Sequence, residues 1–267
     1  MNFQNNILDI FGNNITMDYV FDVIGQGCSA ILVSEHCDNV SIINNTIYSN
    51  GTNPINIIEN ESIINLTANT HVISQLNYGI YFNPKLNSTF VRQNDTLLLN
   101  LSDNQKLIID VPVNVSSYKS NLDNTVILIF DEGSNNSNMS NIKFVNSTIQ
   151  LNNVSKLDIL NNTFNGSLIL IDEGYGNCLV NNTISNSIIK MNNTLSDLLS
   201  DNMFNIDSKS DALIINNSQN ISVLNNHFTG IGDKLIFISS SNSNNSFLKG
   251  LSGTTLVIGF LPNIIQS

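Results

Sequence analysis

Two acidic pairs are the side chains of this sequence best suited to hold a cation. Asp131-Glu132 and Asp172-Glu173 each precede a glycine and follow four or five apolar residues, so we expect both pairs at the same place of a repeated unit. Carboxylate oxygens bind Ca²⁺ at about 2.3 to 2.6 Å. The unit between them carries Asn152-Asn153 there, and two units stacked at about 4.8 Å put the pairs about 10 Å apart, too far to share one ion. Asp131, Glu132, Asp172 and Glu173 are therefore weak calcium candidates, and solvated turn acids are the simpler interpretation.

Histidine and cysteine offer a second, softer kind of site. His36 and Cys37 are adjacent, and Cys28 is near them in the sequence. Soft metals prefer such ligands, but neighbouring residues of a strand point to opposite faces. Cys178 lies in an apolar run and is predicted to be buried in the core. The three cysteines form no complete disulfide framework, and we predict no metal, no cofactor and no catalytic residue.

A short repeated pattern must position these side chains. It consists of two apolar residues, an Asn pair, one free position and then Ile or Phe, and its last copies are spaced about 20, 20 and 24 residues apart, as in stacked-coil proteins. Between copies lie short apolar runs, rich in β-branched residues and bounded by Asn, Ser, Asp and Gly, which predict short strands joined by turns. The chain is therefore predicted to be all-β, a parallel β-helix with coils of about 20 to 24 residues.

The Asn pairs have a physical role in such a coil. Asn tolerates the left-handed backbone region that tight turns need, and its amide can bond to the coils above and below. We assign the second Asn of each pair to a buried ladder, with Ser147 taking its place in one coil, and we expect the following Ile or Phe to stack inside the coils. The predicted ladder residues are Asn14, Asn45, Asn162, Asn182, Asn202 and Asn226.

The repeat is interrupted between residues 67 and 96, where Asn77-Tyr78-Gly79-Ile80-Tyr81-Phe82 is aromatic and the rest of the chain is aliphatic. An open solenoid end needs a cap of different composition. We interpret residues 1–66 as the closing coils of a first β-helix, 67–96 as a linker and aromatic cap, and 97–267 as a second β-helix. A single continuous solenoid with a long inserted loop is the alternative.

Composition excludes several classes of partner. About one residue in five is Asn, and charged residues are 12%, against about a quarter in ordinary domains. A net charge of −11, with Arg92 as the single arginine, argues against nucleic acid. No apolar stretch reaches the length of a membrane span. The start, Met1-Asn2-Phe3, lacks the features of a signal peptide, so we expect a fragment of a longer chain whose export signal and anchor lie elsewhere.

The coils and the aromatic block together give a resemblance. The Asn-Asn-Thr-Ile/Phe repeats, the segment 77–82 and Ile109-Asp110-Val111-Pro112-Val113-Asn114 resemble adhesin-like surface proteins of methanogenic archaea, built from right-handed β-helix repeats of the pectate-lyase-like superfamily. The resemblance implies a right-handed parallel β-helix. It also implies a non-enzymatic module at the cell surface that attaches to glycans or to proteins of other cells.

Two other functions stay open beside adhesion. Polysaccharide lyases and hydrolases share this fold, but a lyase needs a basic proton acceptor near clustered carboxylates, and Arg92 precedes the regular coils. A metal-binding β-helix protein would need His36 and Cys37 to converge with further ligands. Exposed aromatic side chains would instead favour glycan adhesion, and Tyr48, Tyr118 and Tyr175 are the candidates.

About twenty Asn-x-Ser/Thr sequons are compatible with an extracellular, glycosylated protein. The turn pattern itself generates many of them, and ladder asparagines would be buried. We expect only exposed sequons to be modified. The candidates include Asn44, Asn50, Asn65, Asn114, Asn161, Asn181 and Asn192.

Overall fold

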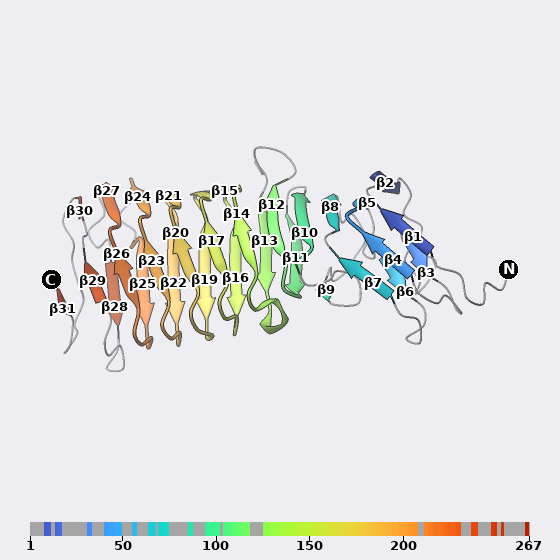
Figure 1. Cartoon of the computed structure of the whole chain (residues 1–267). Helices are drawn as coiled ribbons and strands as arrows, with labels where there is room; N and C mark the ends of the chain where they lie inside the picture. Colours follow the sequence, from blue (N-terminus) through green and yellow to red (C-terminus); the bar gives the residue numbers. More distant parts are fainter. Residues whose placement is uncertain are drawn as a thin grey trace.

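The computed structural model describes side chains in residues 41–46, 69–71, 94–101, 104–117, 125–207 and 211–230, and further strands by their backbone alone. These backbone-only strand segments are residues 8–11, 14–17, 31–33, 40, 47–49, 55–57, 64–67, 72–74, 85–87, 236–239, 247–249, 252–253 and 265–266. The described chain is all-β apart from one short 3₁₀ turn, η1 (Glu132–Ser134), and its strands pair in parallel. The predicted all-β parallel β-helix is confirmed (Figure 1).

The longest sheet, called here the long sheet, has twelve strands and runs along the molecule. Its strand β8 (Thr70–Ser74) pairs with β10 (Thr96–Asn100), so the sheet continues across the residues at which two domains were predicted to meet. The division into two domains stays a prediction. The other strands of this sheet are β2 (Asn14–Met17), β5 (Thr46–Ser49), β12 (Asn114–Ser117), β14 (Asn138–Ser140), β17 (Asp158–Leu160), β20 (Cys178–Val180), β23 (Leu198–Ser200), β26 (Ser222–Leu224), β29 (Phe247–Lys249) and β31 (Ile265–Gln266).

Two further sheets complete the coils, and we name them the second and third sheets. The second sheet has eight strands: β9 (Lys85–Asn87), β11 (Gln105–Asp110), β13 (Val126–Phe130), β16 (Thr148–Asn152), β19 (Leu168–Asp172), β22 (Ile188–Asn192), β25 (Leu213–Asn216) and β28 (Ile236–Ser239). The third sheet has six: β15 (Lys143–Val145), β18 (Thr163–Asn165), β21 (Thr183–Ser185), β24 (Met203–Ile206), β27 (His227–Gly230) and β30 (Ser252–Gly253).

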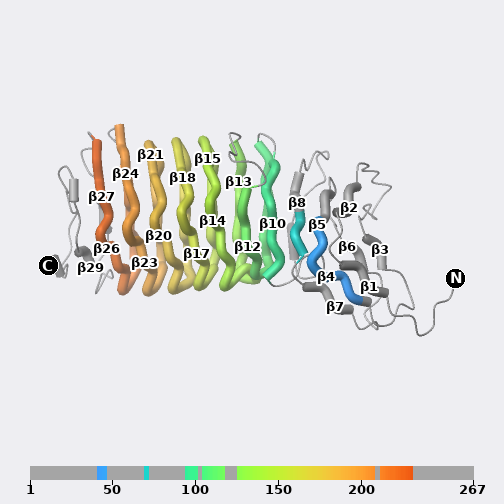
Figure 2. The backbone as a smooth tube through the Cα atoms, turned by 45° about the horizontal axis from the view of Figure 1, so that its top comes forward, coloured from blue at the N-terminus to red at the C-terminus, as the bar shows by residue number. Residues whose placement is uncertain are grey.

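Two small sheets lie at the end of the molecule that holds the first strands. One is formed by β1 (Leu8–Phe11), β4 (Val40–Ile43) and β7 (Ile64–Thr67), and the other by β3 (Ile31–Val33) and β6 (Ile55–Ile57). The backbone tube shows the regular coils from β10 to β27 following one another along a common axis (Figure 2).

One coil has four sides of about five residues each. Starting at β16, the chain passes through a connecting segment, then β17, then β18, and returns to the second sheet at β19, one coil further along. The register gives 20 residues from Thr148 to Leu168 and again from Leu168 to Ile188. The connecting segment, residues 153–157 in this coil, is called the turn side below. Each such coil therefore has three strands plus this turn side.

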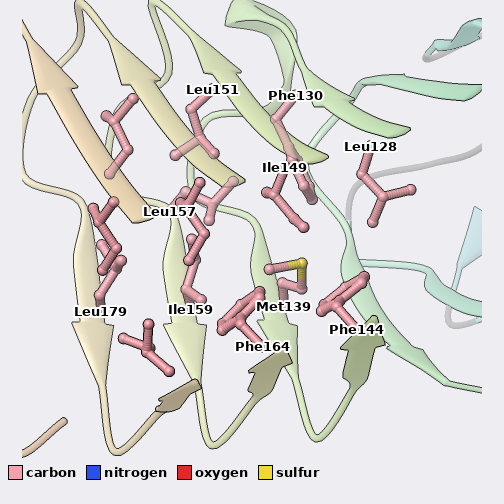
Figure 3. Packing of buried hydrophobic residues seen from close by; sticks show 14 of the residues in the cluster. Leu128, Phe130, Met139, Phe144, Ile149, Leu151, Leu157, Ile159, Phe164 and Leu179 are labelled. Carbon is pink, nitrogen blue, oxygen red and sulfur yellow. The ribbon is translucent and has the colours of Figure 1, made fainter. Parts of the chain in front are cut away.

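The core fills the inside of the coils with single-residue columns. Inward residues of the third sheet stack as Phe144, Phe164, Ile184, Phe204 and Phe228, all fully buried. The rings of Phe144 and Phe164 lie nearly parallel with centroids 5.2 Å apart, and those of Phe204 and Phe228 are 4.4 Å apart. Figure 3 shows Phe144 and Phe164 of this column together with buried leucine and isoleucine side chains of the other sheets. Repeated alternation of buried and outward residues therefore positions every surface side chain in a column of its own.

Candidate functional site

The corner between the long and third sheets holds the asparagine ladder. Asn182 donates its backbone N–H to Asn202 Oδ1 at 2.9 Å, and Asn202 donates likewise to Asn226 Oδ1 at 2.9 Å. Asn162 begins the run, accepting from Ile142 N–H and donating to Asn182 Oδ1. Each amide also donates Nδ2 to a carbonyl of an earlier coil, as Asn202 does to Leu179 O at 2.8 Å. These rungs are buried and fully bonded, so they form structure and offer nothing to a ligand.

The two residues of each Asn pair have different structural roles. The first Asn has a positive φ, for example 56° at both Asn161 and Asn181, and is exposed. The second is the buried rung. A left-handed residue reverses the chain direction at the corner, and Asn accepts that conformation at low cost.

Ser147 lies in a different ladder from the predicted one. The register puts Ile142 opposite Asn162, while Ser147 occupies the corner between the third and second sheets. There Ser147 N–H donates to Ser167 Oγ, and Ser167 N–H donates to Ser187 Oγ, at 3.1 and 2.9 Å. The prediction for Ser147 was wrong because its spacing from Asn162 is 15 residues, three sides of a coil and not a whole one.

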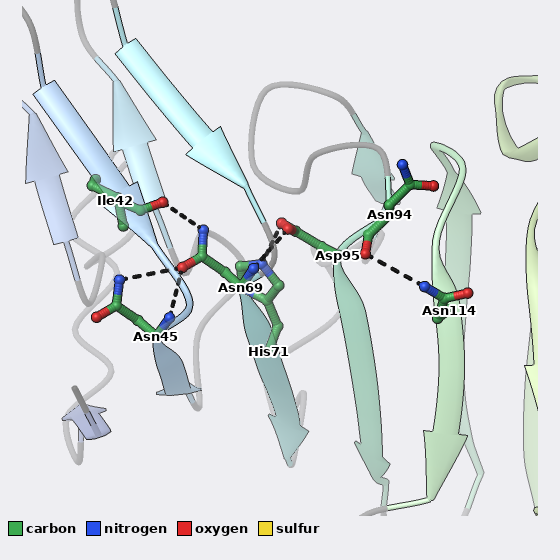
Figure 4. A network of polar contacts seen from close by, with 7 residues as sticks. All are labelled: Ile42, Asn45, Asn69, His71, Asn94, Asp95 and Asn114. Atoms are coloured by element: carbon green, nitrogen blue, oxygen red, sulfur yellow. Dashed lines mark hydrogen bonds and ion pairs between the residues drawn. The ribbon is translucent and has the colours of Figure 1, made fainter. Parts of the chain in front are cut away.

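A mixed network lies near the start of the long sheet (Figure 4). Asn45 N–H donates to Asn69 Oδ1, and Asn69 N–H donates to Asp95 Oδ1 at 2.9 Å. The other oxygen of Asp95 lies 2.8 Å from His71 Nε2, and both side chains are buried. The prediction that Asn45 shares the ladder of Asn162 was wrong, because the register of the long sheet aligns Asn45 with Asn177, at the opposite side of that sheet. Asn14 pairs with Thr46 in the backbone register, one position past the column of Asn45, and its side chain lies outside the described residues.

A third polar column flanks the long sheet on the side opposite the asparagine ladder. Asn177 accepts from Leu157 N–H, and its own N–H donates to Asp197 Oδ1 at 2.7 Å. Asp197 is 1% exposed, and its Oδ2 has no hydrogen-bond partner within the described part of the chain. Burial raises the pKa of the Asp197 carboxyl to about 6, against hydrogen bonds from Asn177 that lower it. This part of the column was not predicted, because Asn177 is unpaired in the sequence and an Asp follows it one coil later. The same column begins with Asn45, Asn69 and Asp95.

The acidic pairs occupy one column, as their sequence contexts suggested. Asn152 pairs with Asp172, and Asn152 Nδ2 donates to Asp131 Oδ1 at 3.1 Å. Asp110 precedes Asp131 by one coil in the same column, and its Oδ1 accepts from Gly133 N–H. Among the described residues, no three His, Cys, Asp or Glu side chains come together in a group that could hold a metal ion. Asp131, Glu132, Asp172 and Glu173 therefore remain a sequence prediction without a formed site.

Several other predicted residues are placed only partly. Cys178 is half-buried at an outward position of β20, where burial, followed by the Asp158 carboxylate, raises the pKa of its thiol. The prediction of a core cysteine was wrong, because the inward position of that strand belongs to Leu179. Some candidates lie outside the residues whose side chains are described, namely His36, Cys37, Cys28, Arg92, Tyr48 and Tyr118.

The turn side carries the largest exposed apolar side chains that lie next to each other in the described chain. Tyr175 and Leu195 are 49% and 46% exposed and pair through a backbone bridge, one coil apart. Lys156 places its ammonium 5.8 Å from the centroid of the Tyr175 ring. The residue before Tyr175 must be glycine, because a Cβ on Gly174 would lie 2.0 Å from Val154 O. We call Tyr175 and Leu195 the apolar strip.

Two columns of polar residues flank the apolar strip, and we call them the rails. One consists of Asn153, Glu173, Asn193 and Asn217, all exposed and all left-handed in backbone. The other consists of Lys156, Gly176, Ser196 and Asn220. Neighbouring rungs are bonded: Asn217 Nδ2 donates to Asn193 Oδ1 at 2.6 Å, and Asn220 Nδ2 donates to Ser196 Oγ at 2.9 Å. An apolar strip between two rows of fixed donors and acceptors is the strongest candidate for a binding surface.

Comparison of the chain with models of protein families, with curated proteins and with solved structures finds no match. Within the described residues, no helix has the length and apolar character needed to cross a membrane. The geometry of the coils must therefore carry the functional argument alone.

Proposed function

We propose that this chain is a non-enzymatic, extracellular attachment module, similar to the adhesin-like surface proteins named above, and that its turn side binds glycans. Cells or glycan-bearing proteins of other cells are its expected partners. The observation that supports this proposal is the apolar strip of Tyr175 and Leu195 between the two rails.

The chemistry of sugars matches such a surface. A pyranose ring has apolar C–H faces, which stack on an aromatic ring, and equatorial hydroxyls, which need donors and acceptors at the ring edge. Tyr175 offers an exposed aromatic ring, and the amides, hydroxyl and carboxylate of the rails offer both kinds of hydrogen-bonding group. Exposed apolar side chains that lie together, rimmed by polar groups, are typical of interaction sites.

The repeat of the solenoid adds a second argument. Coils follow one another at about 4.8 Å, close to the length of one sugar ring in an extended glycan. In a glycan lying along the axis, each successive sugar would therefore face the rail residues of one successive coil. Asn193 and Asn217 are held by their mutual hydrogen bond, so less side-chain entropy is lost on binding.

The test is a glycan-array screen of the full chain, repeated with Tyr175→Ala. We expect the array signal of the best ligand to fall at least tenfold, because the stacking surface is removed. Met203→Ala is the matched control, since Met203 is 47% exposed but lies on the third sheet, away from the turn side. Unchanged binding by Tyr175→Ala would reject this site. Release of reducing ends or unsaturated uronides from any bound polysaccharide would reject the non-enzymatic assignment.

A further inference from the structure

Three Asn-Asn-Thr turns combine a sequon with an accessible side chain. The triplets are Asn44-Asn45-Thr46, Asn161-Asn162-Thr163 and Asn181-Asn182-Thr183. In each, the first Asn is exposed and left-handed, with φ of 55°, 56° and 56°. The second Asn is the buried ladder rung, and the Thr is half-buried at the outward start of the next strand.

The side-chain amides of Asn44, Asn161 and Asn181 make no hydrogen bond within the described part of the chain, whereas those of Asn114, Asn216 and Asn220, three other sequon asparagines, each donate one. Asn220 Nδ2 donates to Ser196 Oγ, and Asn216 Nδ2 donates to Asn192 Oδ1. Asn114 Nδ2 donates to Asn94 O. A bulky substituent on these nitrogens would have to displace or crowd the present neighbour, and Asn44, Asn161 and Asn181 present no such obstacle.

The accessibility of the sequon hydroxyl also differs between the corner and the turn side. Asn153-Val154-Ser155 is a sequon whose Asn is exposed, but Ser155 is buried and its Oγ accepts from Tyr175 N–H at 3.1 Å. At the corner, the side chains of Thr163 and Thr183 lie on the outward face of the third sheet. The corner therefore presents both parts of the acceptor motif at the surface.

We propose that Asn44, Asn161 and Asn181 are sites of N-linked glycosylation. Asn161 and Asn181 lie at the corner between the long and third sheets, and Asn44 lies just before the long sheet, between β4 and β5. The donor class is a lipid-linked oligosaccharyl pyrophosphate. Asn Nδ2 attacks C1 of the first sugar, the C1–O bond to pyrophosphate breaks, and the amide gives up one proton to a base of the transferring enzyme. No electron is exchanged. The folded ladder is compatible with the product, since its rungs are the neighbouring asparagines and lose no hydrogen bond.

This position has a consequence for the binding surface. The long sheet lies between the modified corner and the turn side, since β20 runs from the Asn177 column to Asn181. Glycans on Asn161 and Asn181 leave the apolar strip of Tyr175 and Leu195 open, and they cover outward residues of the third sheet next to them.

The test is expression of the full chain, fused to a secretion signal, in a host with N-glycosylation, followed by peptide mass spectrometry after enzymatic deglycosylation in H₂¹⁸O. We expect Asn161 and Asn181 to be occupied in most molecules, and Asn44 likewise. Thr183→Ala should abolish occupancy of Asn181 without changing that of Asn161, and Thr183→Ser should retain it. A folded, secreted chain with unmodified Asn161 and Asn181 would overturn the assignment. Glycan-array binding, measured on unglycosylated chain, reports separately on the proposed function.

Discussion

Two polar columns border the same long sheet, and they differ in one chemical respect. In the asparagine ladder, each of Asn182, Asn202 and Asn226 accepts with Oδ1 and donates with Nδ2. In the opposite column, Asn177 donates to Val154 O, but the next rung, Asp197, has no amide to donate and keeps one oxygen without a partner in the described chain. A buried ladder thus needs a donor as well as an acceptor on every rung.

Removing one amide from the complete ladder should have the largest effect. Asn202→Ala leaves the Asn182 N–H buried without its acceptor and removes the Nδ2 donor from the Leu179 carbonyl, each at a cost of about 1 to 3 kcal/mol. We expect the free energy of unfolding to fall by about 4 kcal/mol in a denaturant titration. Asp201→Asn is the control, because Asp201 is exposed with a φ of 56°, and it should change stability by less than about 0.5 kcal/mol. Equal loss in both variants would disprove the role of the ladder.

Supplying the missing amide donor at position 197 should instead raise the free energy of unfolding. Asp197→Asn restores an Nδ2 that can donate to the Gly174 carbonyl, the counterpart of Val154 O for Asn177. Folding holds the pKa of Asp197 near 6, above its ordinary 3.8. Protonated Asp197 contributes its full stabilisation, about 3 kcal/mol, below about pH 4. This stabilisation is lost as the pH rises through 6, because the buried carboxyl then ionises.

The measurement is the free energy of unfolding of the natural chain and of Asp197→Asn between pH 4 and pH 8. We expect the free energy of unfolding of Asp197→Asn to rise relative to that of the natural chain as the pH rises, and the difference to level off above pH 7. A difference that stays constant over this range would show that folding does not shift the pKa of Asp197.

The serine ladder should be the least sensitive of the three columns. Ser167 Oγ accepts from Ser147 N–H and donates to Asn165 O, so Ser167→Ala removes a single acceptor for a buried N–H. We expect a loss of about 1 to 1.5 kcal/mol by denaturant titration. Ser185→Ala, at an outward position of β21, is the matched control and should be close to neutral. A loss as large as that of Asn202→Ala would mean that acceptors alone carry ladder stability.

The sequence was sufficient for the fold and for most of the asparagine ladder, because paired asparagines mark both the turn and the rung. It was not sufficient where a rung has no pair: Asn69 and Asn177 stand alone, and Ser147 could be assigned only once the register was known. Tyr175 could be named as an exposed aromatic candidate, but its partner Leu195 could not. Their contact depends on the length of each side of the coil, which the structure fixes through the bridge between them.

The direction of the strands relative to the long axis has a mechanical consequence. Strands β1 and β31 lie at opposite ends of the molecule, and all strands run across the line that joins those ends (Figure 1). Tension applied between the ends would therefore load the hydrogen bonds of one coil boundary after another, in series, and not all strands together. Such an element extends by peeling one coil at a time, each coil releasing about 20 residues of slack, and so a tether built this way would yield gradually under load.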